Sequence, residues 1–475
     1  MGKTNGFLEF QRADIKYREI DKRLNDYNEV TIDKPVEELV EQGGRCMECG
    51  TPFCHNLGCP VGNLIPEWND FIWRGQWKEA FERLEITNNF PELTGRVCPA
   101  TCETSCTLSI NDSPVTIKQN ERAIIEKAFN EGWVIPRPPR EELGQSVAVI
   151  GSGPAGMAAS QQLRRQGYRV TLFEKDRKIG GLLRYGIPDF KLEKSVIDRR
   201  LEQLQAEGLL FETGVTVGED ISIRYLRDKF DAVLFTTGAG VPRDLPVPGR
   251  DLNGVHFALE FLGQSNRRIS KELYEEAEIN AKGKRVLVIG GGDTGSDCVG
   301  TARRQGASKV YQYEIMPKPM VWDKPWNPVW PEWPQILRTT SSHMEGCRRD
   351  WNIETVSLEG KNGRLGRGNF RRIQWVPGEK GARPAMKAVK GSEFSLDVDI
   401  VLLAMGFVHV EHGRAVTDPD LELDGRGNIM ADNYHTSVEG LFTAGDANTG
   451  ASLVVRAINH GRQAAESVHS WLKEQ

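Results

Sequence analysis

The sequence lacks a long hydrophobic run and a strong excess of charge. No stretch of its 475 residues approaches the roughly 20 apolar residues of a membrane-spanning helix, and the N-terminal segment has no apolar signal core. Its 61 lysines and arginines stand against 66 aspartates and glutamates, which gives a net charge of −5. A surface that binds nucleic acid or an anionic membrane would need a basic excess. We therefore expect a cytoplasmic protein whose partners include neither nucleic acid nor a membrane.

Cysteine is scarce in most of the chain. Seven of the nine cysteines lie between Cys46 and Cys106, and only Cys298 and Cys347 lie elsewhere. Disulfides are rare in the cytoplasm, so this uneven distribution favours metal binding over cross-linking. Cys298 has no second cysteine close by, which excludes a redox-active Cys-x-x-Cys pair at that position and favours a packing role.

The seven clustered cysteines have spacings that indicate iron–sulfur ligation. They read Cys46-x2-Cys49-x4-Cys54-x4-Cys59-Pro60 and Cys98-x3-Cys102-x3-Cys106. Zinc takes four ligands per site, so two zinc sites would need a histidine, and only His55 is nearby in the sequence. Iron–sulfur clusters also take four ligands each, and the ligands of two clusters commonly interleave. We expect two [4Fe–4S] clusters with an eighth, non-cysteine ligand; the alternatives are one cluster, zinc or structural thiols.

A dinucleotide-binding motif begins at Val147. An apolar run over 147–150 leads into the turn Gly151-Ser152-Gly153-Pro154-Ala155-Gly156 and then into a helix-forming segment. Such a turn lets the backbone approach a pyrophosphate, and the helix N-terminus presents free N–H groups to it. A second apolar run ends at Glu174, 18 residues after Gly156, where a carboxylate can bind an adenosine ribose. An ordinary glycine loop is the alternative, and the strand, helix and acid together disfavour it.

The same unit occurs a second time. The run over 285–289 leads into Gly290, Gly291, Gly292, Asp293, Thr294 and Gly295. Glu314 follows 19 residues after Gly295, in the position that corresponds to Glu174. Two such units predict two bound dinucleotides, a flavin and a nicotinamide. The carboxylate of Glu314 favours a ribose diol and hence NADH, although Arg303, Arg304 and Lys309 could instead accept the 2′-phosphate of NADPH.

Three further glycine positions are predicted to approach the first dinucleotide. Gly180 and Gly181, followed by Leu182, come soon after the Glu174 strand, and adjacent glycines allow close backbone approach. Gly238 directly follows a predicted buried strand that begins at Asp231 and stops at Thr237. We predict three domains, over residues 1–140, over 145–280 with 410–475, and over 281–409, with the first boundary at the Pro-rich segment 135–142.

The cysteine segments resemble the glutamate synthase small (β) subunit family. The resemblance rests on CMECGTPFCHNLGCPVGNLIPEWND (46–70), GRVCPATCETSCTL (95–108) and VTIKQNERAIIEKAF (115–129), and it runs through both nucleotide motifs. These segments are also similar to the N-terminal half of dihydropyrimidine dehydrogenase. The resemblance implies one cluster on Cys46, Cys49, Cys54 and Cys106, and another on Cys59, Cys98, Cys102 and Glu121. A solvated position on an amphipathic helix is the alternative for Glu121.

The family resemblance also implies an architecture and cofactors. It implies an α/β protein in which a helical iron–sulfur domain precedes two Rossmann-like dinucleotide-binding domains of the two-dinucleotide flavoprotein reductase type. The pair Gly445-Asp446 resembles the motif of that class whose aspartate binds the flavin ribityl chain. FAD, NADH or NADPH and two [4Fe–4S] clusters are the implied cofactors. No side chain is predicted to act as a catalytic acid or base, because hydride passes between bound cofactors.

The implied activity is that of an electron converter in glutamate biosynthesis. NAD(P)H is oxidised at FAD, and the clusters pass electrons to a large (α) subunit that carries FMN and a glutaminase site. That subunit makes L-glutamate from 2-oxoglutarate and glutamine. The alternatives are a stand-alone homologue or a subunit of another oxidoreductase, such as a ferredoxin:NADP oxidoreductase or a sulfide dehydrogenase. A non-enzymatic scaffold is disfavoured because both nucleotide motifs are intact.

One segment has no place in this assignment. Residues 322–334 read WDKPWNPVWPEWP, and this Pro- and Trp-rich loop is either a surface for a partner or an aromatic cap over its own domain.

Overall fold

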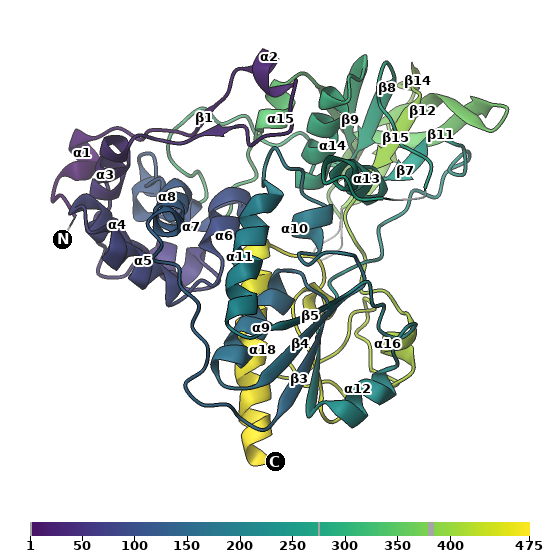
Figure 1. Cartoon of the computed structure of the whole chain (residues 1–475). Coiled ribbons are helices and arrows are strands. Elements are labelled where there is room, and N and C mark those ends of the chain that lie inside the picture. Colours follow the sequence, from purple (N-terminus) through teal and green to yellow (C-terminus); the bar gives the residue numbers. More distant parts are fainter. Residues whose placement is uncertain (1, 274–275, 379–383) are drawn as a thin grey trace.

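The computed structural model describes residues 2–273, 276–378 and 384–475. A helical N-terminal domain lies beside two sheet domains, which we call the first and the second sheet domain (Figure 1). Among the described residues, no helix is both long enough and apolar enough to cross a membrane. The mixed α/β class and the helical N-terminal domain predicted from the sequence are confirmed.

Short helices build the N-terminal domain around buried tryptophans. Trp68 is fully buried on α4, and Trp77 begins α5 with its ring in the core, as their helical spacing indicates. The elements are α1 (Gly6–Glu9), β1 (Lys16–Tyr17), α2 (Ile20–Arg23), β2 (Thr31–Ile32), α3 (Val36–Gly44), the π-helix η1 (Cys54–Gly58), α4 (Ile65–Trp73), α5 (Trp77–Glu85), α6 (Pro91–Val97), α7 (Thr101–Thr104), the 3-10 helix η2 (Thr107–Ile110) and α8 (Ile117–Asn130).

The first sheet domain contains a five-stranded parallel sheet in the order β16-β6-β3-β4-β5. Its outer strand β16 comes from near the C-terminus, and the C-terminal helix α18 packs along α9 (Figure 1). The elements are β3 (Ser146–Ile150), α9 (Pro154–Arg165), β4 (Arg169–Glu174), α10 (Leu182–Tyr185), α11 (Lys194–Ala206), β5 (Leu210–Thr213), α12 (Ile223–Lys229), β6 (Ala232–Phe235), α16 (Arg414–Thr417), β16 (Leu441–Thr443), α17 (Asp446–Thr449) and α18 (Val454–Glu474).

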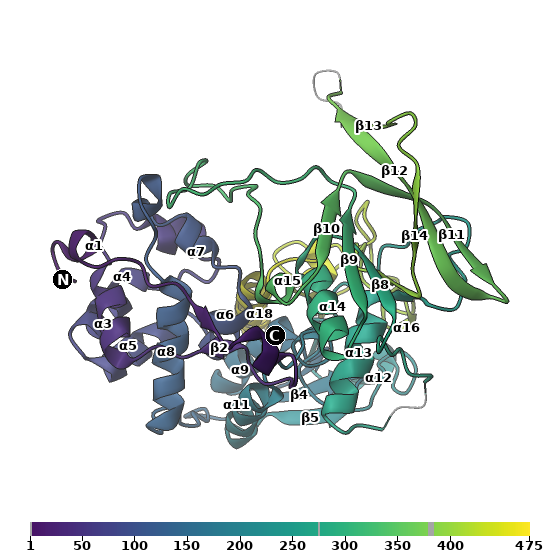
Figure 2. The same ribbon diagram turned by 90° about the horizontal axis from the view of Figure 1, so that it is seen from above.

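The second sheet domain repeats this plan with the parallel order β10-β9-β8-β15-β7. An antiparallel sheet of β11 to β14 projects from it (Figure 2). The elements are β7 (Val255–Phe257), α13 (Ala258–Ile269), β8 (Arg285–Ile289), α14 (Asp293–Arg304), β9 (Lys309–Glu314), α15 (Ser341–Met344), β10 (Arg348–Trp351), β11 (Ile353–Lys361), β12 (Arg364–Val376), β13 (Ala385–Ala388), β14 (Phe394–Asp397) and β15 (Ile400–Leu403).

The boundary predicted near residue 280 needs correction. Strand β7 lies inside the range predicted for the first sheet domain, but it pairs with β15 in the second sheet. The two segments that connect the sheet domains run side by side, with a β-bridge between Pro242 and Phe407. The second sheet domain therefore begins soon after residue 242. Pairing with β15 decides the domain to which β7 belongs, and the three residues of β7 do not reveal that partner in the sequence.

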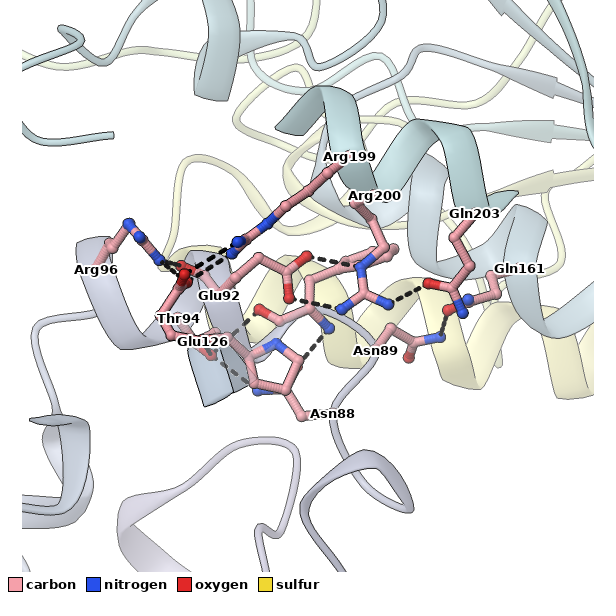
Figure 3. A network of polar contacts seen from close by, with 12 residues as sticks. Asn88, Asn89, Glu92, Thr94, Arg96, Glu126, Gln161, Arg199, Arg200 and Gln203 are labelled. Atoms are coloured by element: carbon pink, nitrogen blue, oxygen red, sulfur yellow. Dashed lines mark hydrogen bonds and ion pairs between the residues drawn. The ribbon is translucent and has the colours of Figure 1, made fainter. Parts of the chain in front are cut away.

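A buried polar network joins the N-terminal domain to the first sheet domain (Figure 3). Arg200 of α11 donates two hydrogen bonds of 2.7 Å to the carboxylate of Glu92 on α6, and both side chains are almost wholly buried. Asn89 donates to Gln161 of α9 at 2.7 Å. Helix α6 leads directly into Cys98, so this network sets the position of that cysteine relative to the first sheet.

Candidate functional site

The first glycine turn has the shape of a phosphate cradle. Gly151 has φ +97°, and a Cβ there would lie 2.6 Å from the carbonyl oxygen of Thr236. A Cβ on Gly156 would lie 2.0 Å from the carbonyl oxygen of Gly151, so these two glycines are required by packing. A Cβ on Gly153 would meet no protein atom within 4 Å. The space in front of Gly153 and the N-terminus of α9 therefore fits a pyrophosphate.

The second turn has the same geometry. Gly290 has φ +121°, and a Cβ there would lie 2.1 Å from the carbonyl oxygen of Ala404. A Cβ on Gly295 would lie 2.4 Å from the carbonyl oxygen of Gly290, whereas one on Gly292 would meet nothing within 4 Å. Helix α14 begins at Asp293 and continues through Thr294, so its N-terminus faces this cradle too.

The two predicted ribose acids lie beside these turns. Glu174 is buried at the end of β4, where its carboxylate accepts hydrogen bonds from the backbone N–H groups of Ser152 (3.0 Å) and Asp176 (2.9 Å). The Ser152 hydroxyl also bonds to Glu174 and accepts the Gly180 N–H, a link that the motif did not reveal. Glu314 accepts the N–H of Gly291 in the second turn.

The C-terminal motif meets the first turn. A Cβ on Gly445 would lie 2.9 Å from the Cβ of Ala155, and a Cβ on Gly181 would lie 3.0 Å from the Cα of Gly153. Asp446 accepts a hydrogen bond of 2.8 Å from Ser452, and burial raises the pKa of its carboxyl group. The structure thus brings together residues that lie almost 300 positions apart in the sequence.

Other predicted positions lie at the edges of this site. Leu182 is 45 % exposed at the start of α10, and a Cβ on Gly238, just after β6, would meet nothing within 4 Å. His460 of α18 was not predicted. Its buried Nδ1 has no hydrogen-bond partner in the part of the chain that the structure describes, and its ring interacts electrostatically with Asp446. An orphaned nitrogen beside Asp446 fits a polar group of a bound flavin.

Arg304, predicted as a possible ligand of a 2′-phosphate, is held elsewhere. Its guanidinium is fully buried and donates hydrogen bonds of 2.6 and 3.0 Å to the carboxylate of Glu345. Arg23 of the N-terminal domain pairs with the same carboxylate at 2.8 Å. Arg303 donates to the backbone oxygen of Glu345. These arginines therefore join domains, and the prediction for Arg304 is wrong because Glu345, 41 residues away, competes for its charge.

A histidine supports the second turn from behind. The Gln312 side-chain amide donates to the carbonyl oxygen of Gly290 at 2.9 Å, and the Gln312 carbonyl oxygen lies 2.8 Å from Nε2 of His343. Burial lowers the pKa of His343 from 6.5 to about 3. His343 thus has a structural role that reaches the glycine turn through Gln312.

Acidification is expected to destabilise the protein through His343. Below pH 6.5 the unfolded chain takes up a proton at this ring, whereas the folded chain does so only near pH 3, so stability falls as the pH decreases. From pH 6.5 to about pH 5 the loss is ~1 kcal/mol per pH unit. Thermal unfolding of His343→Asn should show a shallower acid slope than the parent protein. His412→Gln, at an exposed position, is the control and should keep the parental dependence of Tm on pH. If His343→Asn also keeps that dependence, His343 does not cause the loss of stability in acid.

The clustered cysteines form two electrostatic sets. Burial raises the pKa of the Cys54 thiol, and the charges of Cys106, Cys46 and Cys49 raise it further. Burial likewise raises the pKa of Cys102, to which Cys59 and Cys98 contribute. All four cysteines of the first set line one pocket with apolar walls that include Ile65 and Val115. The sets coincide with the ligand groups implied by the family resemblance.

Glu121 lies with the second set and is not on a solvated face. One oxygen of its carboxylate, Oε1, accepts hydrogen bonds of 3.0 Å from Asn63, Asn88 and Thr94. Burial raises the pKa of Glu121 to about 7, and its charge acts on Cys59, Cys98 and Cys102. The three donors fix the position of the carboxylate oxygen Oε1.

The spacing of these side chains differs from that of a single-ion site. Among the described residues, no group of three or more His, Cys, Asp or Glu side chains is placed to hold one metal ion. In a [4Fe–4S] cluster each protein ligand binds a different iron, so its ligands lie farther apart than those of one zinc ion.

Family models match both parts of the chain. Residues 23–133 match dihydropyrimidine dehydrogenase domain II, 4Fe-4S cluster, and residues 145–461 match pyridine nucleotide-disulphide oxidoreductase. A protein of Mycobacterium tuberculosis named glutamate synthase [NADPH] small chain is 50 % identical over 99 % of this chain and 96 % of its own length. The chain belongs to the glutamate synthase small-chain family. It is an NAD(P)H-dependent flavoprotein oxidoreductase with FAD and 4Fe–4S centres as cofactors.

Other members of the glutamate synthase family differ in length and in the coenzyme named. The small chain of Bacillus subtilis, named for NADPH, is 42 % identical over 99 % of both chains. The glutamate synthase [NADH] of Schizosaccharomyces pombe is 46 % identical over 98 % of this chain but only 23 % of its own length. M. tuberculosis FprA in complex with NADPH shares the fold, with a TM-score of 0.54 and 18 % identity over 70 % of this chain and 85 % of that chain.

Proposed function

We propose that this chain is the electron-input subunit of a glutamate synthase. It oxidises NAD(P)H at FAD and delivers electrons through two [4Fe–4S] clusters to a large subunit. That subunit carries FMN and a glutaminase site and makes L-glutamate from 2-oxoglutarate and glutamine. The observation that carries the proposal is the presence, in one chain, of two glycine turns shaped to hold a pyrophosphate and two separate sets of clustered cysteines.

Each bound group has its own residues. The cradle at Gly153, with Glu174, Gly181 and Asp446, would hold FAD, and the cradle at Gly292, with Glu314, would hold the nicotinamide coenzyme. Cys46, Cys49, Cys54 and Cys106 would ligate one cluster, and Cys59, Cys98, Cys102 and Glu121 the other. When bound, these groups supply hydride transfer and single-electron transfer. The protein contributes binding, orientation and burial.

The arrangement of the domains supports this assignment. Helix α6, which carries Glu92 and Thr94 and precedes Cys98, packs against α11 and α18 of the first sheet domain. Cys98 of the second set therefore directly follows a helix that packs on the domain proposed to bind FAD. The S. pombe relative supports a larger partner, because the unit that matches this chain is a minor part of a longer glutamate synthase there.

Cofactor analysis followed by reconstitution tests the proposal. Anaerobically purified protein should contain about eight irons and eight sulfides per FAD, and NADH or NADPH should bleach its visible absorbance. Addition of a purified large subunit should yield glutamate from 2-oxoglutarate and glutamine, whereas ferredoxin should be a poor acceptor. Little iron would contradict the two-cluster assignment. Rapid ferredoxin reduction without glutamate formation would favour the ferredoxin:NADP oxidoreductase alternative.

The coenzyme preference should depend on Glu314. Its carboxylate accepts the Gly291 N–H, at the place where a 2′-phosphate would meet a like charge, and Arg303 and Arg304 are held by Glu345. We therefore expect NADH to be preferred. Glu314→Gln should shift the ratio of kcat/KM values about tenfold toward NADPH, equivalent to ~1.4 kcal/mol. The two kcat/KM values are measured by steady-state reduction of ferricyanide with NADH and with NADPH, and Glu422→Gln is the surface control. An unchanged ratio would show that Glu314 does not set the preference.

A further inference from the structure

The Pro- and Trp-rich loop 322–334 reaches away from the second sheet domain. It crosses to the N-terminal domain and lies against α7 and η2, as the green chain above the body in Figure 2 shows. Of the two interpretations of this loop from the sequence, a cap over its own domain is therefore excluded: the loop caps another domain.

Polar contacts hold the loop in place. Asn327 is buried, its N–H donates to the carbonyl oxygen of Ser109 at 2.6 Å, and its side-chain amide donates to that of Thr104 at 3.0 Å. The Ser105 hydroxyl donates to the carbonyl oxygen of Pro331 at 3.1 Å. Because these buried amide and carbonyl groups need their hydrogen-bond partners, they fix the loop in one position on the N-terminal domain.

Trp330 contacts the backbone of Cys106, a member of the first cysteine set. Its indole N–H donates to the carbonyl oxygens of Cys106 (3.1 Å) and Ser105 (3.3 Å). Its ring packs on Phe53, with ring centroids 4.8 Å apart and planes tilted by 48°. Phe53 directly precedes Cys54, so one side chain contacts both segments that carry Cys54 and Cys106.

We propose that Trp330 is a positioning residue for the first iron–sulfur centre, supplied by the nicotinamide-binding domain. It joins the backbone of Ser105 and Cys106 to the ring of Phe53, and so holds together two segments whose residues Cys106 and Cys54 line the pocket and limits the access of water between them. The inference rests on the proposed function, because it presupposes a cluster on Cys46, Cys49, Cys54 and Cys106.

The expected consequence is that less water reaches a cluster bound by the first cysteine set. A reduced cluster carries one more negative charge than an oxidised one, and water stabilises that charge, so exclusion of water lowers the reduction potential. Loss of the indole would admit water, raise the potential of this cluster and expose its ligands. The cluster on the second set, which has no described contact with the loop, should keep its potential.

Three variants of the anaerobic holoprotein test the proposal. Trp330→Ala removes the ring and the N–H, whereas Trp330→Phe keeps a ring against Phe53 but removes the N–H. Trp322→Ala is the matched control, since the described contacts of Trp322 are with Trp326 of the same loop (indole N–H to backbone oxygen, 2.8 Å; ring centroids 5.9 Å). The readouts are iron release to a ferrous chelator in air and cluster potentials from an electron paramagnetic resonance redox titration.

We expect Trp330→Ala to lose iron about tenfold faster, in the range typical of residues that support metal ligands. One of two cluster signals should shift to higher potential, Trp330→Phe should lie between, and Trp322→Ala should match the parent. If the parent protein shows two cluster signals and neither Trp330→Ala nor Trp330→Phe changes their potentials, the role of Trp330 is overturned while the proposed function stands. A parent protein without two cluster signals would instead overturn the proposed function. If Trp330→Ala does not fold, Trp330→Phe decides.

Discussion

Glu92→Gln is expected to destabilise the interface between the N-terminal domain and the first sheet domain by about 3–5 kcal/mol. The substitution leaves the guanidinium of Arg200 charged in a buried site, where it now makes two hydrogen bonds of 2.7 Å to Glu92 (Figure 3). Water cannot replace those bonds, because the Glu92 and Arg200 side chains are 0 % and 6 % exposed. The measurement is the Tm of anaerobic protein together with the iron content.

Two controls identify the cause. Glu67→Gln breaks an ion pair with Arg83 in which both side chains are more than a third exposed, and such pairs contribute at most about 1 kcal/mol. The double variant Glu92→Met/Arg200→Met removes both buried charges and should recover much of the loss. A double variant less stable than Glu92→Gln would show that the interface depends on shape rather than on charge pairing.

Gly156→Val is expected to abolish FAD binding, and Gly153→Ala should weaken it without unfolding the domain. A Cβ at position 156 would lie 2.0 Å from the carbonyl oxygen of Gly151 and 2.7 Å from Oγ1 of Thr236, so α9 must move away from the turn. A Cβ at position 153 would meet no protein atom within 4 Å and would enter only the cradle. We expect the second change to cost ~1–3 kcal/mol of FAD affinity, or about tenfold to a hundredfold.

Flavin content and Tm together separate these effects. Gly156→Val should lose FAD and Tm, whereas Gly153→Ala should lose FAD affinity and keep the Tm of the flavin-free protein. The corresponding pair in the second sheet domain, Gly295→Val and Gly292→Ala, provides the internal control, because it should leave FAD content unchanged. Parental FAD affinity in Gly153→Ala would place the flavin phosphates elsewhere.

The family and the class of chemistry could be predicted from the sequence because their signals are local. The turns at Gly151 and Gly290 need positive φ angles that glycine adopts readily, so the spacing of the glycines was enough to predict two turns of this shape. The number of cysteines and their spacing indicated iron–sulfur centres, which the match to a 4Fe-4S family model confirmed.

Long-range partners decided the rest. Arg304 looked available for a phosphate, but its charge is paired with the buried carboxylate of Glu345, which also pairs with Arg23 of the N-terminal domain. Glu121 could have been a surface residue, but the packing of α8 against α6 and other helices of the N-terminal domain buries it. The hydrogen bond from Trp330 to the backbone of Cys106 likewise joins residues that lie 224 positions apart in the sequence. Local patterns therefore determined which groups this protein holds, and the tertiary structure decided which side chains surround them, because burial and charge pairing depend on segments that meet only after folding.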